Sequence, residues 1–271
     1  MSNMRTNALR LIALNEAVER TVERINSSPE PVPDSIMKAD DQICPGVELS
    51  THLQVHIVPA AIDHIWYLTN SIKSTKRFPV FGSYTLVRST IETASTLAWV
   101  AAPKERTERL TRHLRLEAAN ISAARNMLST QNEVGAYLGY RVDPRAPAEF
   151  VAERLVALKE AADRVGIRRD LLNGRPPSVS TIVKGAASES DQSPQLFLDW
   201  QIASGAAHGK PWSGLLTLMP QGGWGTNPRV EPNGDRSAGI LTMIETAERA
   251  LAMLSHGLDH LERLRATQDL P

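Results

Sequence analysis

Two short stretches of the chain carry polar residues whose types and spacing fit chemistry. Arg88 and Glu92 are four residues apart, so both side chains share one face of a helix. Ser204 and His208 are also four apart, among small residues that let a ligand or another helix approach. A guanidinium binds acidic groups, and a carboxylate beside an imidazole can exchange a proton. The sequence therefore predicts a pocket in which Arg88 and Ser204 bind a small polar or anionic ligand, while Glu92 and His208 are catalytic.

The helix that carries Arg88 and Glu92 is expected to be the central element of the fold. Residues 83–102 are apolar or small on almost every side, which is typical of a buried helix. An ionised group in such a helix needs a partner, because an unpaired buried charge is strongly destabilising. Gly209 is a natural helix stop, so it places His208 at a helix end. We expect His208 to pair there with Glu92.

The remaining sequence predicts an all-α fold. Amphipathic spacing and capping residues predict further helices at about 5–26, 51–75, 104–131, 147–165, 193–208 and 236–266, and leave residues 178–187 open between a short helix and irregular chain. Pro59 is expected to kink or divide the second of these, because proline removes a backbone donor. We predict one helical domain over residues 1–271, a bundle of six or seven helices whose core spans about 50–266.

Three stretches are expected to differ from the core. The N-terminal helix 5–26 is expected to be peripheral, and residues 27–48, with three prolines in five positions, to form a loose connector. Residues 210–234 are rich in Gly, Pro and Trp and are expected to form a small irregular or hairpin flap over the pocket. The helix 236–266 has heptad-like spacing, so it either closes the bundle or forms the seam of a homodimer.

Composition limits the partners. The formal net charge is zero, so no overall field favours nucleic acid or an anionic membrane. The one cysteine, Cys44, excludes an internal disulfide and fits a reducing cytoplasm. Arg88 and Glu92 interrupt the most apolar stretch, which is also short for a membrane span. We expect a cytoplasmic protein that binds neither membrane nor nucleic acid.

A structural or regulatory protein is the main alternative, in which the same four polar groups only hold helices in register. A metal site is another hypothesis. Its candidate ligands are His56, His64, Glu92, His113, Glu117 and His208, and no paired Glu-x-x-His or His-Glu-x-x-His motif joins them. The spaced pairs His52/His56 and His256/His260 are expected to be exposed. The sequence therefore assigns no metal ligand, and the cofactor is unknown.

A ribonuclease of the HEPN type is the third alternative, because its active helix carries an arginine a few residues before a histidine. Here Arg106 or Arg109 precedes His113. Acidic residues alternate with the arginines of this helix, a pattern that favours a solvated, salt-bridged face over an RNA-binding one.

The motifs resemble those of the DUF5677-like bacterial helical proteins, a group common in actinobacteria. The shared features are Arg88-Ser89-x-x-Glu92 in a central helix and Ser204-x-x-x-His208-Gly209 at a late helix end. Asp63 and His64 also fit the group's pattern. The similarity covers roughly residues 50–212 and implies a helical fold with a shared polar cluster. It adds Asp63 and His64 to the expected ligand-binding residues.

Overall fold

The computed structural model describes residues 2–75, 80–138, 145–173, 177–190, 194–210 and 237–266, together with Trp212. Over these residues the secondary structure is helical and includes no strand, which confirms the predicted all-α class. None of the helices in these ranges combines the length and apolar character needed to span a bilayer. Apart from Lys210 and Trp212, the flap predicted at about 210–234 lies outside the described residues.

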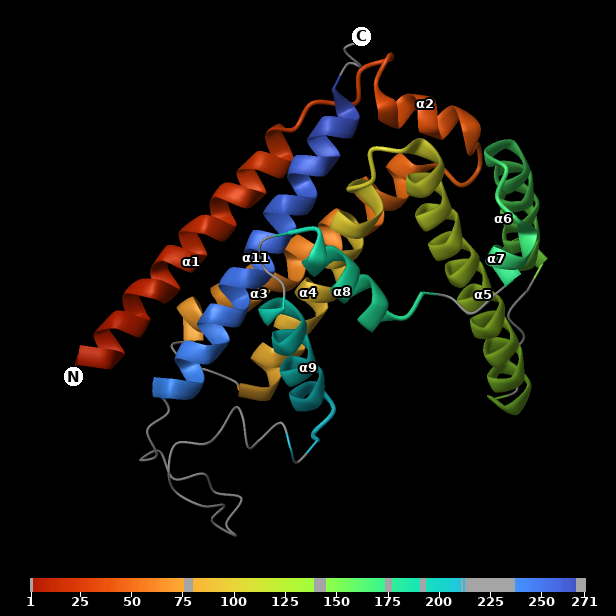
Figure 1. Ribbon diagram of the computed structural model, residues 1–271. Coiled ribbons are helices and arrows are strands. Elements are labelled where there is room, and N and C mark those ends of the chain that lie inside the picture. The colour runs from red at the N-terminus through yellow and green to blue at the C-terminus, as the bar shows by residue number, and fades with distance from the viewer. Residues whose placement is uncertain are drawn as a thin grey trace. The chain divides into compact units, whose positions relative to one another are not determined.

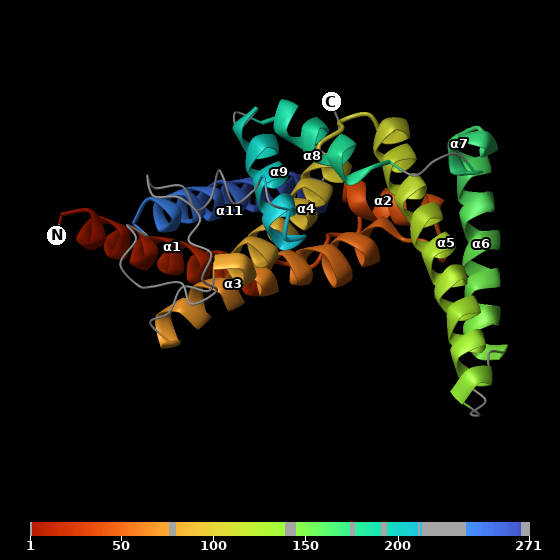
Figure 2. The same ribbon diagram turned by 90° about the horizontal axis from the view of Figure 1, so that it is seen from below.

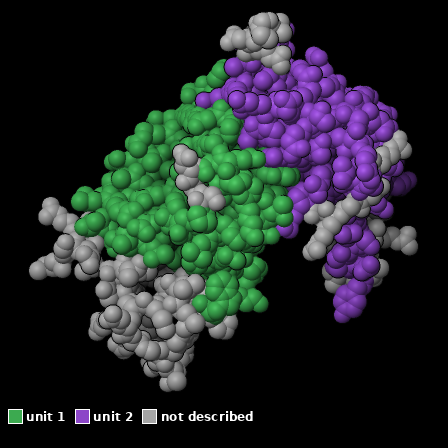
Figure 3. Space-filling view, in the orientation of Figure 1, with its two compact units in different colours: residues 1–29, 57–99, 179–260 green, residues 30–56, 100–178, 261–271 purple. Residues whose placement is uncertain are grey.

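The chain forms two compact units, and each unit is built from three separate segments of the sequence (Figure 3). Unit 1 comprises residues 1–29, 57–99 and 179–260, and unit 2 comprises residues 30–56, 100–178 and 261–271. The helices of unit 1 are α1 (Ser2–Ser27), α3 (Val58–Thr75), α4 (Val80–Ala101), α8 (Val179–Ser188), α9 (Gln195–Ala207) and α11 (Ser237–Arg265). Those of unit 2 are α2 (Ile36–Ile43), the π-helix η1 (Thr51–Ile57), α5 (Arg106–Leu138), α6 (Arg145–Val165) and α7 (Arg169–Asn173). The last residues of α4 and α11 belong to unit 2.

Helix α4 is the buried helix that the sequence predicts. Val87, Ile91 and Leu97 on this helix have no exposed surface. Helix α11 approaches it closely at Gly257, where an added Cβ would lie 2.9 Å from the Leu97 side chain and 3.2 Å from the Ala98 backbone nitrogen. A hydrogen at position 257 is therefore what allows α11 to reach α4.

Helix α1 lies along α11 within unit 1, as Figures 1 and 2 show from two directions. Arg10 near one end of α1 forms ion pairs with Glu245 and Glu248 of α11, and Arg24 near the other end pairs with Asp259. Partly exposed pairs of this kind contribute little free energy each, about 0–1 kcal/mol, but they fix which faces of the two helices meet.

The apolar stripe of α11 is buried within a single chain. Met243, Ile244, Ala247, Leu254 and Leu258 are at most 3% exposed. Because these side chains are already covered, the heptad-like spacing serves to close the bundle. The burial favours this alternative over the predicted homodimer seam.

Pro59 divides the helical stretch 51–75, as predicted. The segment before it is the π-helix η1, and regular α-helix starts at Val58. Proline has no backbone N–H to give to the preceding turn, and a π-helical turn accommodates the missing bond by widening to i→i+5 spacing.

The connector 27–48 is not loose, and this prediction was wrong. It contains α2, capped by the Ser35 hydroxyl, which accepts from the Lys38 N–H at 3.2 Å. Met37, Asp40 and Cys44 have no exposed surface. The Asp40 carboxylate receives the Nε of Arg109 at 2.6 Å, and Arg109 Nη1 also donates to the Pro103 carbonyl at 2.8 Å. A buried ion pair therefore ties the connector to the start of α5.

Helices α5 and α6 of unit 2 run side by side (Figure 2). Leu110 and Leu114 of α5 are fully buried against Leu158 and Ala161 of α6. Gly166 ends α6 in the left-handed region at φ +77°, as predicted from its position after Val165.

Gly257→Ala tests the close approach of α11 to α4. An alanine in an exposed helix interior usually stabilises relative to glycine by about 1 kcal/mol. Here the added methyl would lie 2.9 Å from the buried Leu97 side chain and 3.2 Å from the Ala98 backbone nitrogen, so we expect a loss of about 1–3 kcal/mol in the free energy of unfolding, measured by urea denaturation. Gly82→Ala, at an exposed position of α4, is the matched control and is expected to be neutral or stabilising. An increase in stability from Gly257→Ala would contradict this packing.

Candidate functional site

The polar groups expected in unit 1 meet around Arg88. On α4 the Arg88 Nε donates to Glu92 Oε1 at 2.7 Å. From α9 the Trp200 indole Nε1 donates to the same oxygen at 2.8 Å. Arg88 Nη1 lies 3.0 Å from Nε2 of His208. We call these four residues the α4–α9 cluster.

The glycine after His208 holds this histidine at the end of α9. Gly209 has φ +62°, in the left-handed region, and the Lys210 N–H donates to the Gly205 carbonyl at 2.8 Å, which closes the helix end. An arginine can only donate, so His208 Nε2 accepts from Arg88 and the ring proton lies on Nδ1. The Ser-x-x-x-His-Gly motif thus places an exposed imidazole against the guanidinium.

Glu92 and His208 both contact Arg88 but not each other. Where the structure describes the chain, no hydrogen bond or ion pair joins them. The predicted direct pair is therefore not formed, because the guanidinium has donors on two edges and lies between the two groups. The Arg88 and Glu92 side chains are 25% and 24% exposed, so they lie at the edge of the core rather than inside it.

The other expected ligand-binding residues do not join the cluster. Ser204 is half-buried one turn before the end of α9. Among the described residues, Ser204, Asp63 and His64 make no side-chain hydrogen bond or ion pair with the cluster. Asp63 is exposed on α3 and lines a shallow, open groove of about 520 Å³. The other residues of this groove are Val22, Pro59, Ala60, Ile62 and Trp66.

Trp200 is the member of the cluster that the sequence did not predict. It stacks on Phe197, with ring centroids 5.6 Å apart, and Lys184 Nζ lies 4.5 Å from the Phe197 ring centroid. A tryptophan in an apolar helix usually signals packing alone. Its position four residues before Ser204 was the available signal, because residues at that spacing share a face.

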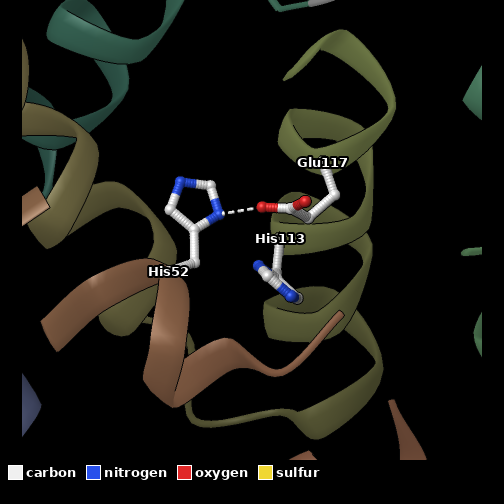
Figure 4. A group of neighbouring side chains, drawn as sticks. All are labelled: His52, His113 and Glu117. Carbon is white, nitrogen blue, oxygen red and sulfur yellow. Dashed lines mark ion pairs between the residues drawn. The ribbon is translucent and has the colours of Figure 1, made fainter. Parts of the chain in front are cut away.

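A second polar cluster is buried in unit 2, where η1 meets α5 (Figure 4). His52 comes from η1, and His113 and Glu117 are one turn apart on α5. One potential ligand atom from each residue lies within 4.8 Å of the other two. His52 Nδ1 is 2.7 Å from Glu117 Oε1. We call these three residues the His–His–Glu cluster.

The His–His–Glu cluster unites two of the metal ligands considered from the sequence with one that was expected to be exposed. His52 is only 8% exposed, whereas His56 is exposed. The prediction that both are exposed is therefore wrong for His52 and correct for His56. The contact with α5 accounts for the burial of His52, whose ring centroid lies 5.3 Å from that of His113 and whose Nδ1 lies 2.7 Å from Glu117 Oε1. His64 lies on α3 in unit 1, and Glu92 and His208 belong to the α4–α9 cluster.

Burial and nearby charges shift the pKa values of His113 and Glu117. Burial is the main influence on His113 and, with His52 nearby, lowers its pKa to about 4. The ring is therefore neutral at pH 7. Burial alone would raise the pKa of Glu117, but His52 and Arg154 together lower that pKa to about 2. Arg154 Nη2 donates to Glu117 Oε2 at 2.8 Å, so the carboxylate is ionised and anchored on both oxygens.

The arginine and histidine of the nuclease hypothesis are buried. Arg109 is 1% exposed and bound to Asp40, and His113 has no exposed surface. The solvated face expected for the arginines of α5 is thus wrong for Arg109, although Arg112 forms the expected kind of pair with Glu108. An RNA strand cannot reach Arg109 or His113 in this arrangement, which weighs against a HEPN-like active helix.

No protein-family model matches the chain, and no curated protein or solved structure is significantly similar to it. The resemblance to the DUF5677-like proteins therefore stays a prediction that rests on the motifs of α4 and α9.

The buried His113 predicts a specific loss of stability in mild acid. The unfolded chain binds a proton here below about pH 6.5, whereas the folded chain does so only near pH 4. Stability is thus fully present above pH 6.5 and falls as the pH drops to 4, by about 3 kcal/mol for this group. The contribution of Glu117 to stability is lost at lower pH, as the pH falls from about 4.5 toward 2.

Urea unfolding between pH 7 and pH 4, in the presence of EDTA, measures this loss. His113→Gln keeps a side-chain N–H for the Val47 carbonyl but cannot take up a proton, so its stability should fall less over this window than that of the wild type. Equal pH dependence of the two proteins would rule out His113 as its source.

Proposed function

We propose that this protein binds a small polar or anionic molecule at the α4–α9 cluster. The observation that carries the proposal is the fixed position of Arg88. Its Nε and Nη1 are occupied by Glu92 and His208, and Glu92 is held in turn by Trp200. Nη2 makes no hydrogen bond in the described part of the chain, so both of its N–H groups remain for a ligand.

An arginine held in this way is pre-organised. The guanidinium loses little rotational freedom when it binds an acceptor, because Glu92 and His208 already fix its plane. The partial exposure of Arg88 and Glu92 leaves the cluster within reach of a ligand. His208 offers an Nδ1–H beside it, and the half-buried Ser204 lies one turn back on α9. These groups are donors that suit a carboxylate or a phosphate.

A purely structural role is the alternative, and the exposure of Arg88 and Glu92 argues against it. An i,i+4 ion pair that is a quarter exposed contributes only about 0.3–0.5 kcal/mol to stability. Such a pair needs neither an indole donor nor a histidine acceptor to persist. A cytoplasmic setting remains part of the proposal and is supported by the single, buried thiol of Cys44.

Thermal unfolding with inorganic phosphate and with acetate as probes tests the proposal. We expect either probe, at millimolar concentration, to raise the Tm of the wild-type chain. Arg88→Gln should weaken binding at least about tenfold, because it removes the charged donors. Arg112→Gln is the matched control, because Arg112 forms another i,i+4 pair with a glutamate and should leave the effect unchanged.

Two results would contradict ligand binding at Arg88. One is a wild-type Tm that neither probe changes. The other is an equal response in Arg88→Gln and Arg112→Gln. A lower Tm in Arg88→Gln without any probe effect in the wild type would favour the structural alternative.

A further inference from the structure

The His–His–Glu cluster of unit 2 has the chemistry of a metal centre. We propose that His52, His113 and Glu117 bind one divalent first-row transition metal ion, such as zinc. The inference is independent of the proposed ligand at Arg88, which lies in the other unit. Two imidazoles and one carboxylate form a recognised three-ligand set for zinc, which leaves a fourth position open.

His113 is already oriented as a metal ligand. Its Nε2 lies 2.7 Å from the Val47 carbonyl, and because a carbonyl only accepts, Nε2 carries the ring proton. Nδ1 of the neutral ring therefore has a lone pair and no hydrogen. This atom is buried and has no partner among the described residues. A histidine that donates one N–H to a backbone carbonyl and directs the other nitrogen at a metal is the usual arrangement in metal sites.

Figure 4 shows how the three side chains converge. One ring nitrogen of His113 points toward His52 and the Glu117 carboxylate, and the other points away from them. Because Nε2 is bound to the Val47 carbonyl, Nδ1 is the nitrogen left for an ion. The cluster therefore offers a buried, unused donor beside an ionised carboxylate.

The contact between His52 and Glu117 is close but poorly aligned for a hydrogen bond. Nδ1 and Oε1 are 2.7 Å apart, yet the His52 Nδ1 has no hydrogen-bond partner of acceptable direction in the described structure. A metal ion bound by both His52 Nδ1 and Glu117 Oε1 would make this direction unimportant, because the nitrogen would then bind the ion through its lone pair and carry no hydrogen. His52 can ligate through Nδ1 when its proton moves to Nε2, a change of tautomer that leaves the charge of the ring unchanged.

The surroundings hold the carboxylate in place for one oxygen to bind the ion. Arg154 occupies Glu117 Oε2 at 2.8 Å, and Oε1 faces His52, with Asn120 Nδ2 at a longer 3.4 Å. Metal-bound carboxylates are commonly hydrogen-bonded at the oxygen that does not ligate.

The donor types select the class of metal. Calcium and magnesium prefer sites built from oxygen atoms, whereas two imidazole nitrogens with a carboxylate suit zinc and its neighbours in the first transition row. Soft ions that require thiolate are disfavoured, because His52, His113 and Glu117 offer no sulfur ligand.

Isothermal titration of the chelator-stripped, full-length protein with zinc chloride tests the proposal. We expect one zinc ion per chain in the wild type. His113→Gln keeps an N–H for the Val47 carbonyl but removes the Nδ1 donor, and Glu117→Gln keeps the shape of the carboxylate. Each substitution should weaken zinc binding at least about 100-fold.

His256→Ala is the matched control. His256 and His260 are the other close pair of histidines, with Nε2 atoms 3.1 Å apart on α11. The substitution should leave the affinity for zinc unchanged. Loss of zinc binding in His256→Ala, with full binding in Glu117→Gln, would overturn the proposal, as would a wild-type protein that takes up no zinc. If His113→Gln fails to fold, Glu117→Gln alone decides between these outcomes.

Discussion

The pairing of buried carboxylates is the constraint on which both units depend. A carboxylate removed from water is tolerated only if cations or N–H donors replace its hydration, so each one determines what must lie beside it. Glu117 forms ion pairs with His52 of η1 and Arg154 of α6. Asp40 of α2 forms one with Arg109 of α5. In unit 1, Asp199 of α9 is 2% exposed and is paired with Arg249 of α11. Apolar burial supplies most of the stability, but these pairs decide which helix faces meet.

The same constraint explains why the two candidate sites differ. In the α4–α9 cluster the carboxylate of Glu92 is at the edge of the core, and its partners leave part of a guanidinium open to solvent. That arrangement suits a ligand that arrives from water. In the His–His–Glu cluster every member is buried, and the group left unsatisfied is a nitrogen lone pair. A small cation can fill that position, whereas a larger molecule cannot.

The features of the fold that depend on local sequence were predicted correctly. The α class, the buried α4, the break near Pro59 and the helix ends at Gly166 and Gly209 all follow from spacing, proline chemistry or left-handed glycine. The contacts of Asp40 could not be predicted in this way, because its partner Arg109 lies 69 residues later and no local pattern indicates the pairing. Sequence alone also placed His52 on an exposed face, because the residues that bury it, His113 and Glu117, lie on another helix far along the chain. The sequence predicted Arg88, Glu92 and His208 of the α4–α9 cluster but not Trp200, and it did not predict that Arg88 lies between Glu92 and His208, because the reach of an arginine side chain cannot be read from spacing.

A zinc-edge anomalous difference map of crystals soaked in zinc chloride tests whether the unsatisfied, buried Nδ1 of His113 beside the paired carboxylate of Glu117 is part of a metal site. We expect one strong peak bounded by His52, His113 and Glu117, with His113 bound through Nδ1. A map with no peak there, or with zinc only at His256 and His260, would contradict it.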